Sequence, residues 1–370
     1  MPIEPRNRKL LFHFGHHKTG STSIQNAFAT GRVKLVGGHI LYPGRLNHNY
    51  LRHHFEIYAR EGRVLPGGPA FPGLATISEL LGRGGYEVAV ISGEAFEEAS
   101  PQATKKVLQE FMLPHVTEHL VIGYIRPHAA RLLSNFAEHT KIGILGGSPE
   151  SFFDETLASG LFFYAPRMAE WAKAFGAHLR LKPLIRSELA GGDVLHDFIE
   201  TGFGPNAQAE IAPAPAANES LTVEDLLVVK LVQDRLQARG PNLRLEIGWE
   251  LAEAFGEAAR MGASGTKLML HKSLAERIRI TYRADAAAMD ARFFGGRNLM
   301  RDELDRAVDE ALPVPQSLEL ADYFSADALR AVSVLATQIS RMFDHQAGPW
   351  RDFLLQRRMA ALHGETAGKP

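Results

Sequence analysis

The sequence predicts an α/β fold, a three-layer sandwich in which helices flank a central, mostly parallel sheet, with a largely helical C-terminal part added. Two observations predict this class. Apolar runs typical of buried strands alternate with segments of helical apolar spacing in the first part of the chain. An Ala/Pro-rich stretch then ends the alternation. We therefore expect a core over residues 1–205, a linker or loop over 206–218, and a helical region over 219–370 that packs on the core.

Five segments have the character of strands. They are β-branched or apolar and are bounded by turn residues: 9–14, 39–41 (weak), 86–91, 119–125 and 180–185. Strands that alternate with helices favour a parallel sheet, in which ligands bind beyond the carboxyl ends of the strands.

Helices are predicted between and after these strands. One begins at Ser21 and places Ile24, Ala27 and Phe28 on one face, and Pro101 is suited to be the first residue of another. Further helical patterns follow residue 127, run from 221 to 236, and occupy most of 325–363.

Composition excludes several classes of function. The chain has 370 residues, of which 45% are hydrophobic and 22% are charged, as in a globular protein with a sizeable core. A net charge of -1 lacks the broad positive field that nucleic-acid binding needs. The absence of cysteine excludes disulfides, thiolate metal sites and cysteine nucleophiles. With a polar start and an apolar run too short for a signal peptide or a membrane span, we expect a cytoplasmic protein.

The sharpest motif lies between the first strand and the first helix. It reads Gly15-His16-His17-Lys18-Thr19-Gly20-Ser21-Thr22. A glycine-containing turn lets the backbone approach an anion, and the first amides of a helix point towards it. Lys18 adds a positive charge, and the hydroxyls of Ser21 and Thr22 add donors. The pattern indicates a phosphate-binding loop; the alternative is an ordinary strand-to-helix turn with a capping serine.

This loop differs from that of nucleoside triphosphatases, in which the lysine follows the second glycine. Here Lys18 precedes Gly20. The later strand also leads into Ser92-Gly93-Glu94, without an aspartate placed to hold magnesium. A nucleotide-dependent phosphotransferase is therefore the second hypothesis.

A second anion site is predicted at the end of the strand 119–125. Arg126 follows that strand, and Ser134 lies about two turns into the next helix. An arginine can grip a phosphate with two parallel hydrogen bonds. At a strand end it can equally serve as an ion-pair partner. Two anion sites on one sheet edge suit a nucleotide that carries phosphates at both its 5′ and 3′ ends.

At these residues the chain resembles a known family. The segment Phe14 to Thr22 resembles the 5′-phosphosulfate loop of sulfotransferases, and Ile122 to Ser134 resembles their 3′-phosphate motif. Weaker similarity to bacterial sulfotransferase-like proteins includes 91–96, 161–176 with its Trp171, and 218–221. The resemblance implies the P-loop-like sulfotransferase fold. It also implies 3′-phosphoadenosine-5′-phosphosulfate (PAPS) as co-substrate, its desulfated product PAP (3′,5′-diphosphoadenosine), and in-line sulfuryl transfer without a metal.

The resemblance further implies roles for single residues. The expected nucleotide ligands are His17, Lys18, Thr19, Gly20, Ser21, Thr22, Arg126 and Ser134. Lys18 would also stabilise charge on the leaving phosphate. The acceptor, a hydroxyl or an amine, must lose its proton to a general base.

Glu94 is the first candidate for this base, because it follows the strand between the two motifs. His48 is the second candidate. Their alternative roles are an ion-pairing or capping glutamate and a surface histidine. Zinc binding by His48, His53 and His54 lacks a recognised ligand signature, so no metal is predicted.

The acceptor class is less defined by the sequence. A carbohydrate or another small metabolite is favoured by analogy, and the Gly-, Pro- and His-rich stretch 37–85 is expected to form part of its binding site. A protein that binds the nucleotide without catalysis is the third hypothesis.

Overall fold

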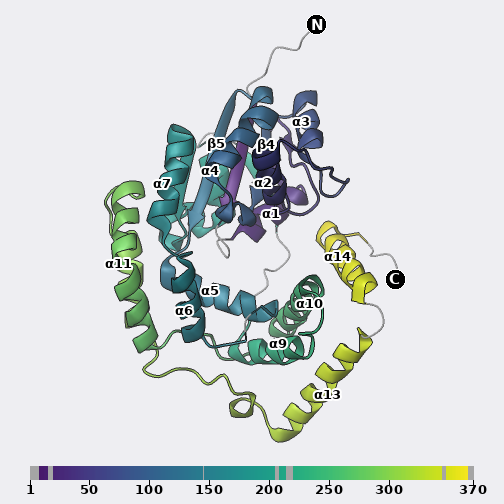
Figure 1. Ribbon diagram of the computed structural model, residues 1–370, viewed down its shortest axis with the longest axis vertical. Coiled ribbons are helices and arrows are strands. Elements are labelled where there is room, and N and C mark those ends of the chain that lie inside the picture. The colour runs from purple at the N-terminus through teal and green to yellow at the C-terminus, as the bar shows by residue number, and fades with distance from the viewer. Residues whose placement is uncertain are drawn as a thin grey trace. The chain divides into compact units, whose positions relative to one another are not determined.

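The computed structural model describes residues 8–15, 20–144, 146–204, 208–213, 220–343 and 347–365. A five-stranded sheet runs in the order β3-β4-β1-β5-β6, and every neighbouring pair is parallel (Figure 1). Its strands are β1 (Lys9–Gly15), β3 (Ile40–Leu41), β4 (Val88–Gly93), β5 (Glu118–Ile125) and β6 (Leu179–Pro183). The predicted fold class is confirmed, and the five expected strands are all present.

The centre of the sheet is apolar on both faces. Every residue of β1 after Lys9 is buried, as is every residue of β4. The sequence of a strand that is covered on both sides is a nearly continuous apolar run, because no position has to face water. This is why the central strands are recognisable in the sequence.

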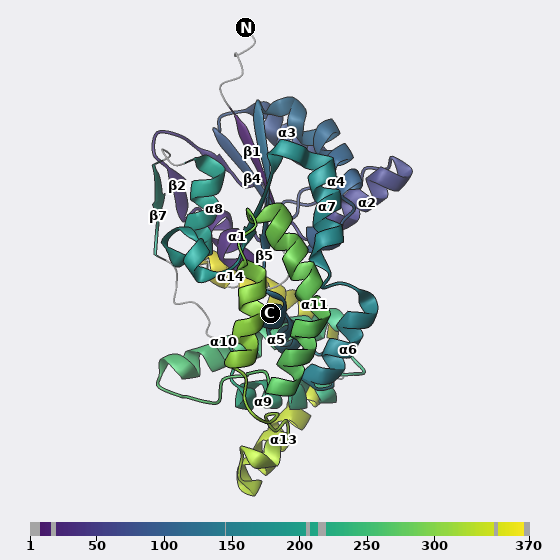
Figure 2. The ribbon, with the colours of Figure 1, turned by 90° about the vertical axis from the view of Figure 1, so that its left-hand side faces the viewer.

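Helices cover the two faces separately, as Figure 2 shows. On one face, α1 (Ser21–Ala29) and α8 (Val194–Phe203) pack against Leu11 and neighbouring strand residues. On the other face lie α7 (Tyr164–Phe175), α2 (Leu51–Glu61) and α4 (Pro101–Val107). Alternate residues of β1 serve the two faces: Phe12 contacts the rings of Phe55 and Phe96 on the second.

Two helices of the sheet-containing region differ from the sequence-based expectation. Residues 37–85 include α2 and α3 (Leu74–Arg83), where only a Gly- and Pro-rich binding stretch was expected. Each is short and buries three residues: Leu51, Phe55 and Ile57 in α2, and Leu74, Ile77 and Leu81 in α3. Glycines stand on both sides of α3, and Gly62 ends α2, so these turn residues are easier to recognise in the sequence than the helical spacing of apolar residues.

The expected linker contains a strand. Of residues 206–218, the structure describes 208–213, and β7 (Ala209–Ile211) pairs antiparallel with β2 (Val33–Leu35). Val33 lies opposite Ile211, and both pack against the apolar cluster beneath α1 and α8. Strand β7 precedes the Ala/Pro-rich residues 212–217, of which 214–217 lie outside the described residues, so the linker or loop expected over 206–218 stays a prediction.

The chain forms two compact units. Unit 1, which holds the sheet, comprises residues 1–127, 163–214 and 284–301; unit 2 comprises 128–162, 215–283 and 302–370. The chain passes from unit 1 to unit 2 between residues 214 and 215, within the expected stretch 206–218, and it also crosses between the units after residues 127, 162, 283 and 301. Unit 2 has an apolar cluster of its own that includes Leu236, Leu243 and Ile247.

Helices dominate the described part of unit 2. They are α5 (His128–Lys141), α6 (Pro149–Ser159), α9 (Val223–Arg235), α10 (Pro241–Arg260), α13 (Ala326–Met342) and α14 (Ala347–His363). Helices α11 (Lys272–Phe293) and α12 (Leu299–Asp309) have residues in both units. Short turns of other helix types are η1 (Glu94–Glu98), η2 (Leu108–Met112), η3 (Leu113–His115), η4 (Gly176–His178), η5 (Arg186–Glu188), η6 (Ala190–Gly192) and η7 (Leu320–Asp322).

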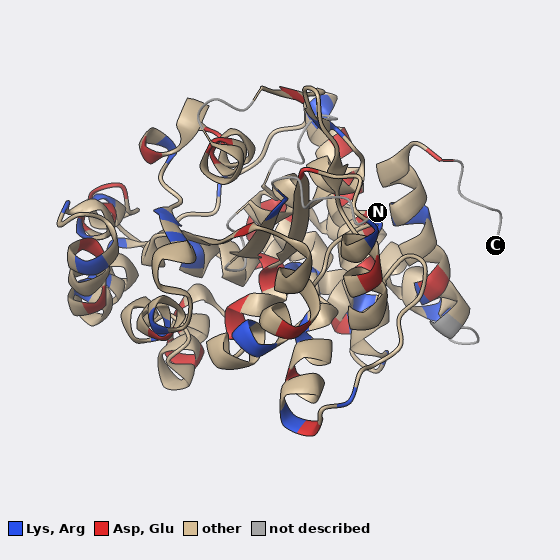
Figure 3. Cartoon of the chain, turned by 90° about the horizontal axis from the view of Figure 1, so that it is seen from above, with Lys and Arg blue, Asp and Glu red and all other residues tan. Residues whose placement is uncertain are grey.

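Acidic and basic residues are interspersed along the same helices (Figure 3). Arg52 and Glu56 of α2 form an i,i+4 pair, as do Lys230 and Asp234 of α9. Such pairs are typical of solvated helix faces and stabilise them only slightly. Across the described ranges, the structure contains no helix with the combined length and apolar character needed to cross a bilayer.

Candidate active site

Three neighbouring strands end at one edge of the sheet. In the register of the sheet, Phe14 lies opposite Gly93 of β4, and Gly15 lies opposite Tyr124 of β5. Neighbouring strands lie about 4.8 Å apart, so their carboxyl ends are close in space. Glu94 follows β4 directly and Arg126 follows β5 directly. The sheet therefore brings the backbone at Glu94 and Arg126 to either side of the loop that follows β1.

The centre of that loop lies outside the described residues. This applies to His16, His17, Lys18 and Thr19. The ends of the loop are described: Gly15 is the last residue of β1, and Gly20 immediately precedes α1. Helix α1 has no side-chain cap. Its first amides are therefore oriented as at helix ends that bind anions.

Gly20 is a position at which a side chain would not be tolerated. Its φ of 78° lies in the left-handed region. A Cβ atom there would also lie 2.7 Å from Cγ1 of Val194 on α8. After it, Ser21 is buried and Thr22 is exposed. The close packing of Gly20 against α8 fixes where α1 begins.

Glu94 is half-buried at the start of η1. The backbone on both sides of it is held by one segment of the chain. The N–H of Ala95 donates to Oδ1 of Asn49 (3.2 Å), and the N–H of His48 donates to the carbonyl of Ser92 (2.9 Å). These contacts fix the turn from which the Glu94 side chain emerges.

His48 is fully buried and uses both ring nitrogens. Nδ1 accepts the N–H of Ser92 (3.0 Å), and Nε2 lies 2.7 Å from the carbonyl oxygen of Pro43. Nε2 therefore carries the proton, and the ring is neutral. Burial lowers the pKa of His48 to about 4. A ring with both nitrogens bonded to the backbone is suited to holding the chain rather than to taking a proton from an acceptor.

His13 is a buried polar residue that the sequence did not single out. Its Nδ1 lies 2.7 Å from Oγ of Ser92, and its ring packs edge-on against Tyr124 and Phe198. Burial lowers the pKa of His13 to about 3. Two neutral histidines thus bind Ser92, which lies two residues before Glu94. His13 contacts the Ser92 hydroxyl, and His48 contacts the Ser92 backbone.

Arg126 is half-buried, and its backbone carbonyl accepts the hydroxyl of Tyr164 (2.8 Å). Burial lowers the pKa of its guanidinium, and the nearby Tyr164 opposes that shift. Ser134 is half-buried on α5. Arg126 belongs to unit 1 and Ser134 to unit 2, so the structure describes the two residues separately.

Helix α7 adds residues that local sequence chemistry did not assign a role. Trp171 stacks on Phe14 with ring centroids 4.0 Å apart and an interplanar angle of 4°. Tyr164, at the start of the same helix, reaches Arg126. Helix α7 therefore contacts both the strand that precedes the loop and the residue that follows β5.

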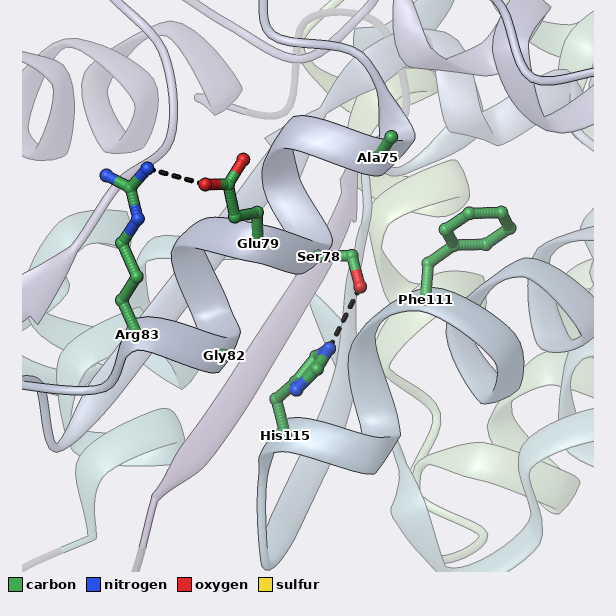
Figure 4. A pocket seen from close by; sticks show the side chains of 7 residues that line it. All are labelled: Ala75, Ser78, Glu79, Gly82, Arg83, Phe111 and His115. Carbon is green, nitrogen blue, oxygen red and sulfur yellow. Dashed lines mark hydrogen bonds and ion pairs between the residues drawn. The ribbon is translucent and has the colours of Figure 1, made fainter.

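A groove of about 630 Å³ lies away from these strand ends. Its lining comes from α3, η2 and η3, and the chain continues from them into the amino ends of β4 and β5. At its base Ser78 Oγ lies 2.9 Å from Nε2 of His115, with Phe111 on the opposite wall (Figure 4). None of the residues predicted singly as nucleotide ligands or as the base lines it, although five of its seven lining residues fall in the stretch 37–85 that was expected to form part of the acceptor site.

Metal ligands do not gather in the described part of the chain. No group of three or more His, Asp or Glu side chains there has the arrangement that a bound ion would need. His48, His53 and His54 illustrate this, since His48 is committed to the backbone and His53 is exposed.

Comparisons with known proteins show a distant similarity to a solved structure. No protein-family model matches the chain. No curated protein matches it either. Among solved structures, a sulfotransferase from Alicyclobacillus acidocaldarius is similar, with 13% sequence identity and a TM-score of 0.41. The match covers 80% of this chain and 99% of the other.

Proposed function

We propose that the protein is a sulfotransferase that moves a sulfuryl group from PAPS to a hydroxyl or amine acceptor. The observation that carries this proposal is the arrangement of three adjacent strand ends. The order β4-β1-β5 supports it, because the chain at Gly15, at Glu94 and at Arg126 leaves neighbouring strand ends at one edge of the sheet. The proposed reaction needs a base, a phosphosulfate loop and a ligand of the 3′-phosphate close to one another.

The described residues fit a nucleotide with two separate phosphate groups. Gly20 has the left-handed backbone conformation that glycine-containing anion-binding turns use. Burial disfavours the charged form of the Arg126 guanidinium and lowers its pKa. A bound phosphate would stabilise that charged form. Lys18 and its neighbours are proposed as ligands of the phosphosulfate, and Ser134 as a second ligand of the 3′-phosphate.

The transfer follows from these roles. The acceptor oxygen or nitrogen attacks the sulfur, a new bond to sulfur forms, and the bond between sulfur and the bridging oxygen of the 5′-phosphate breaks. Negative charge grows on that bridging oxygen, where Lys18 and the loop amides would stabilise it. The proton of the acceptor passes to Glu94. We prefer Glu94 to His48 as the base because both ring nitrogens of His48 are bonded to the backbone.

The acceptor is proposed to be a carbohydrate or another small metabolite that binds beside residues 43–50. This segment reaches Glu94 through the contacts of His48 with Ser92 and of Asn49 with Ala95. It also carries Tyr50, whose hydroxyl donates to the carbonyl of Pro72 and thereby ties the segment to the rest of the stretch 37–85.

A binding experiment tests the nucleotide. We expect calorimetry of the whole chain, without added magnesium, to give much tighter binding of PAP than of ADP or AMP, because only PAP occupies both anion sites. A preference for ADP, or binding that requires magnesium, would contradict the proposal and favour a phosphotransferase.

Two variants then test the chemistry. Lys18→Ala is expected to lower kcat roughly 100-fold or more. Glu94→Gln is expected to lower kcat by about the same factor or more, with the Kd for PAP unchanged. Lys34→Ala and Glu257→Gln change exposed residues of the same types outside the predicted sites and serve as controls. Normal turnover in Glu94→Gln would remove Glu94 as the base.

A further inference from the structure

An aspartate distant in sequence holds the start of helix α7. Asp285 on α11 is 7% exposed. Its Oδ2 accepts the N–H of Tyr164 and its Oδ1 accepts the N–H of Ala165, both at 2.9 Å. These are the first two amides of α7, whose N-cap residue, Phe163, provides no side-chain hydrogen bond. A carboxylate there both satisfies the amides and interacts favourably with the helix dipole.

The first two turns of α7 also contact residues next to both predicted anion sites. Tyr164 has a fully buried side chain, and its hydroxyl donates to the carbonyl of Arg126 at 2.8 Å. Tyr164 is therefore bonded at its backbone to Asp285 and at its side chain to Arg126. About two turns further on, Trp171 stacks on Phe14, just before the phosphate loop. A displacement of α7 would move the supports of both predicted anion sites.

We propose that Asp285 is a positioning residue for nucleotide binding. By fixing the amides of Tyr164 and Ala165, its carboxylate sets the position of Arg126 relative to the loop after β1. This proposal rests on the proposed function, since it assumes that Arg126 binds a phosphate. Asp285 acts through Tyr164 and needs no contact with the nucleotide itself.

The same helix supplies a matched control. Asp290 also caps a helix: its Oδ1 accepts the N–H of Met300 (2.8 Å), and its Oδ2 accepts the N–H of Arg301 (3.3 Å). These residues lie in α12, which carries none of the predicted site residues. Asp290 is fully buried, so its loss should cost stability at least as much as the loss of Asp285.

The experiment compares the variants Asp285→Ala, Asp285→Asn, Asp290→Ala and Asp290→Asn in the full chain. The Kd for PAP is measured by calorimetry, well below the unfolding midpoint of each variant. We expect Asp285→Ala to raise the Kd about tenfold, the effect of losing a well-placed hydrogen bond to a charged group. Asp285→Asn retains one acceptor and should raise it less. The Asp290 variants should lower Tm and leave the Kd within about twofold.

A double variant tests the path through Tyr164. Tyr164→Phe removes only the hydroxyl that bonds Arg126 and should also raise the Kd for PAP. If Asp285 acts through Tyr164, Asp285→Asn combined with Tyr164→Phe should weaken binding by less than the product of the single effects. This comparison does not require Asp285→Ala to fold.

The outcomes separate this inference from the function on which it rests. Wild-type protein that binds PAP, together with Asp285 variants of unchanged Kd, would overturn the positioning role alone. Asp285 and Asp290 variants that raise the Kd equally would also overturn it, since the effect would then reflect general loss of stability. Wild-type protein that does not bind PAP would overturn the proposed function and, with it, this role.

Discussion

At the scale of single residues, the candidate site depends on buried histidines that remain neutral. His48 and His13 both contact Ser92, and burial holds their pKa values at about 4 and about 3. Charging either ring would place an uncompensated cation among apolar side chains. Because both rings contact Ser92, we expect the stability of the turn before Glu94 to depend on pH through His48 and His13.

The pH dependence has a definite sign. Unfolded histidine takes up a proton near pH 6.5, whereas His48 in the folded protein does so only near pH 4. Between these values the unfolded state binds more protons, so stability falls as pH falls. The contribution of His48 is complete above about pH 6.5 and decreases by about 1.4 kcal/mol per pH unit towards pH 4.

The variant His48→Asn checks this prediction. The amide oxygen of asparagine can replace Nδ1 as acceptor for the N–H of Ser92, but it does not titrate. Urea unfolding at pH 7.5 and pH 5 should show a smaller pH-dependent loss of the free energy of unfolding in the variant than in the wild type. Equal losses in the two proteins would show that His48 is not the group that titrates.

At the scale of elements, an aromatic pair packs helix α7 against strand β1. Trp171 is 1% exposed and lies flat on the buried ring of Phe14. We expect Trp171→Ala to lower the free energy of unfolding by about 3–5 kcal/mol, because it leaves a cavity against β1. Trp171→Phe retains a ring and should recover a large part of this loss. The measurement is urea unfolding of both variants, and equal stability of the two would contradict the stacking argument.

Elements with a strong local signal could be predicted from the sequence. The apolar runs of β1, β4 and β5 indicate central strands, and Pro101 correctly marks the first turn of α4. That Gly15, Glu94 and Arg126 lie at one edge of the sheet follows from these runs and from the general rule for parallel sheets, whereas the strand order comes from the structure. Helices α2 and α3 were missed, because each has only three buried positions within a glycine-rich stretch.

Roles that depend on distant contacts could not be predicted. His48 lies among Asn47, Asn49 and Tyr50, which suggests a surface turn, yet it is buried and accepts a hydrogen bond from Ser92, 44 residues away. Asp285 caps a helix 121 residues earlier in the chain. No local pattern marks either contact, because the partner residues become neighbours only when the chain folds.

At the scale of the whole molecule, the two compact units have separate apolar clusters. Leu11 belongs to the cluster of unit 1 and Leu236 to that of unit 2, and both are fully buried. Separate cores allow separate cooperative transitions. We expect calorimetric unfolding to show two transitions rather than one.

Matched cavity variants assign the transitions. Leu11→Ala and Leu236→Ala should each cost about 2–5 kcal/mol, and each should lower the midpoint of one transition only. If both variants shift a single common transition, the two units unfold together and the prediction is contradicted.

Helix α11 has a consequence for how the chain can be divided. Residues 272–283 of this helix belong to unit 2, whereas residues from 284 onwards, Asp285 included, belong to unit 1. A fragment that ends after the sheet, near residue 214, would leave the first amides of α7 without their carboxylate. Gene fusion or recombination that exchanges the helical half for another would break the sheet-containing half as well. We therefore expect related proteins to contain unit 1 and unit 2 together, encoded in one gene.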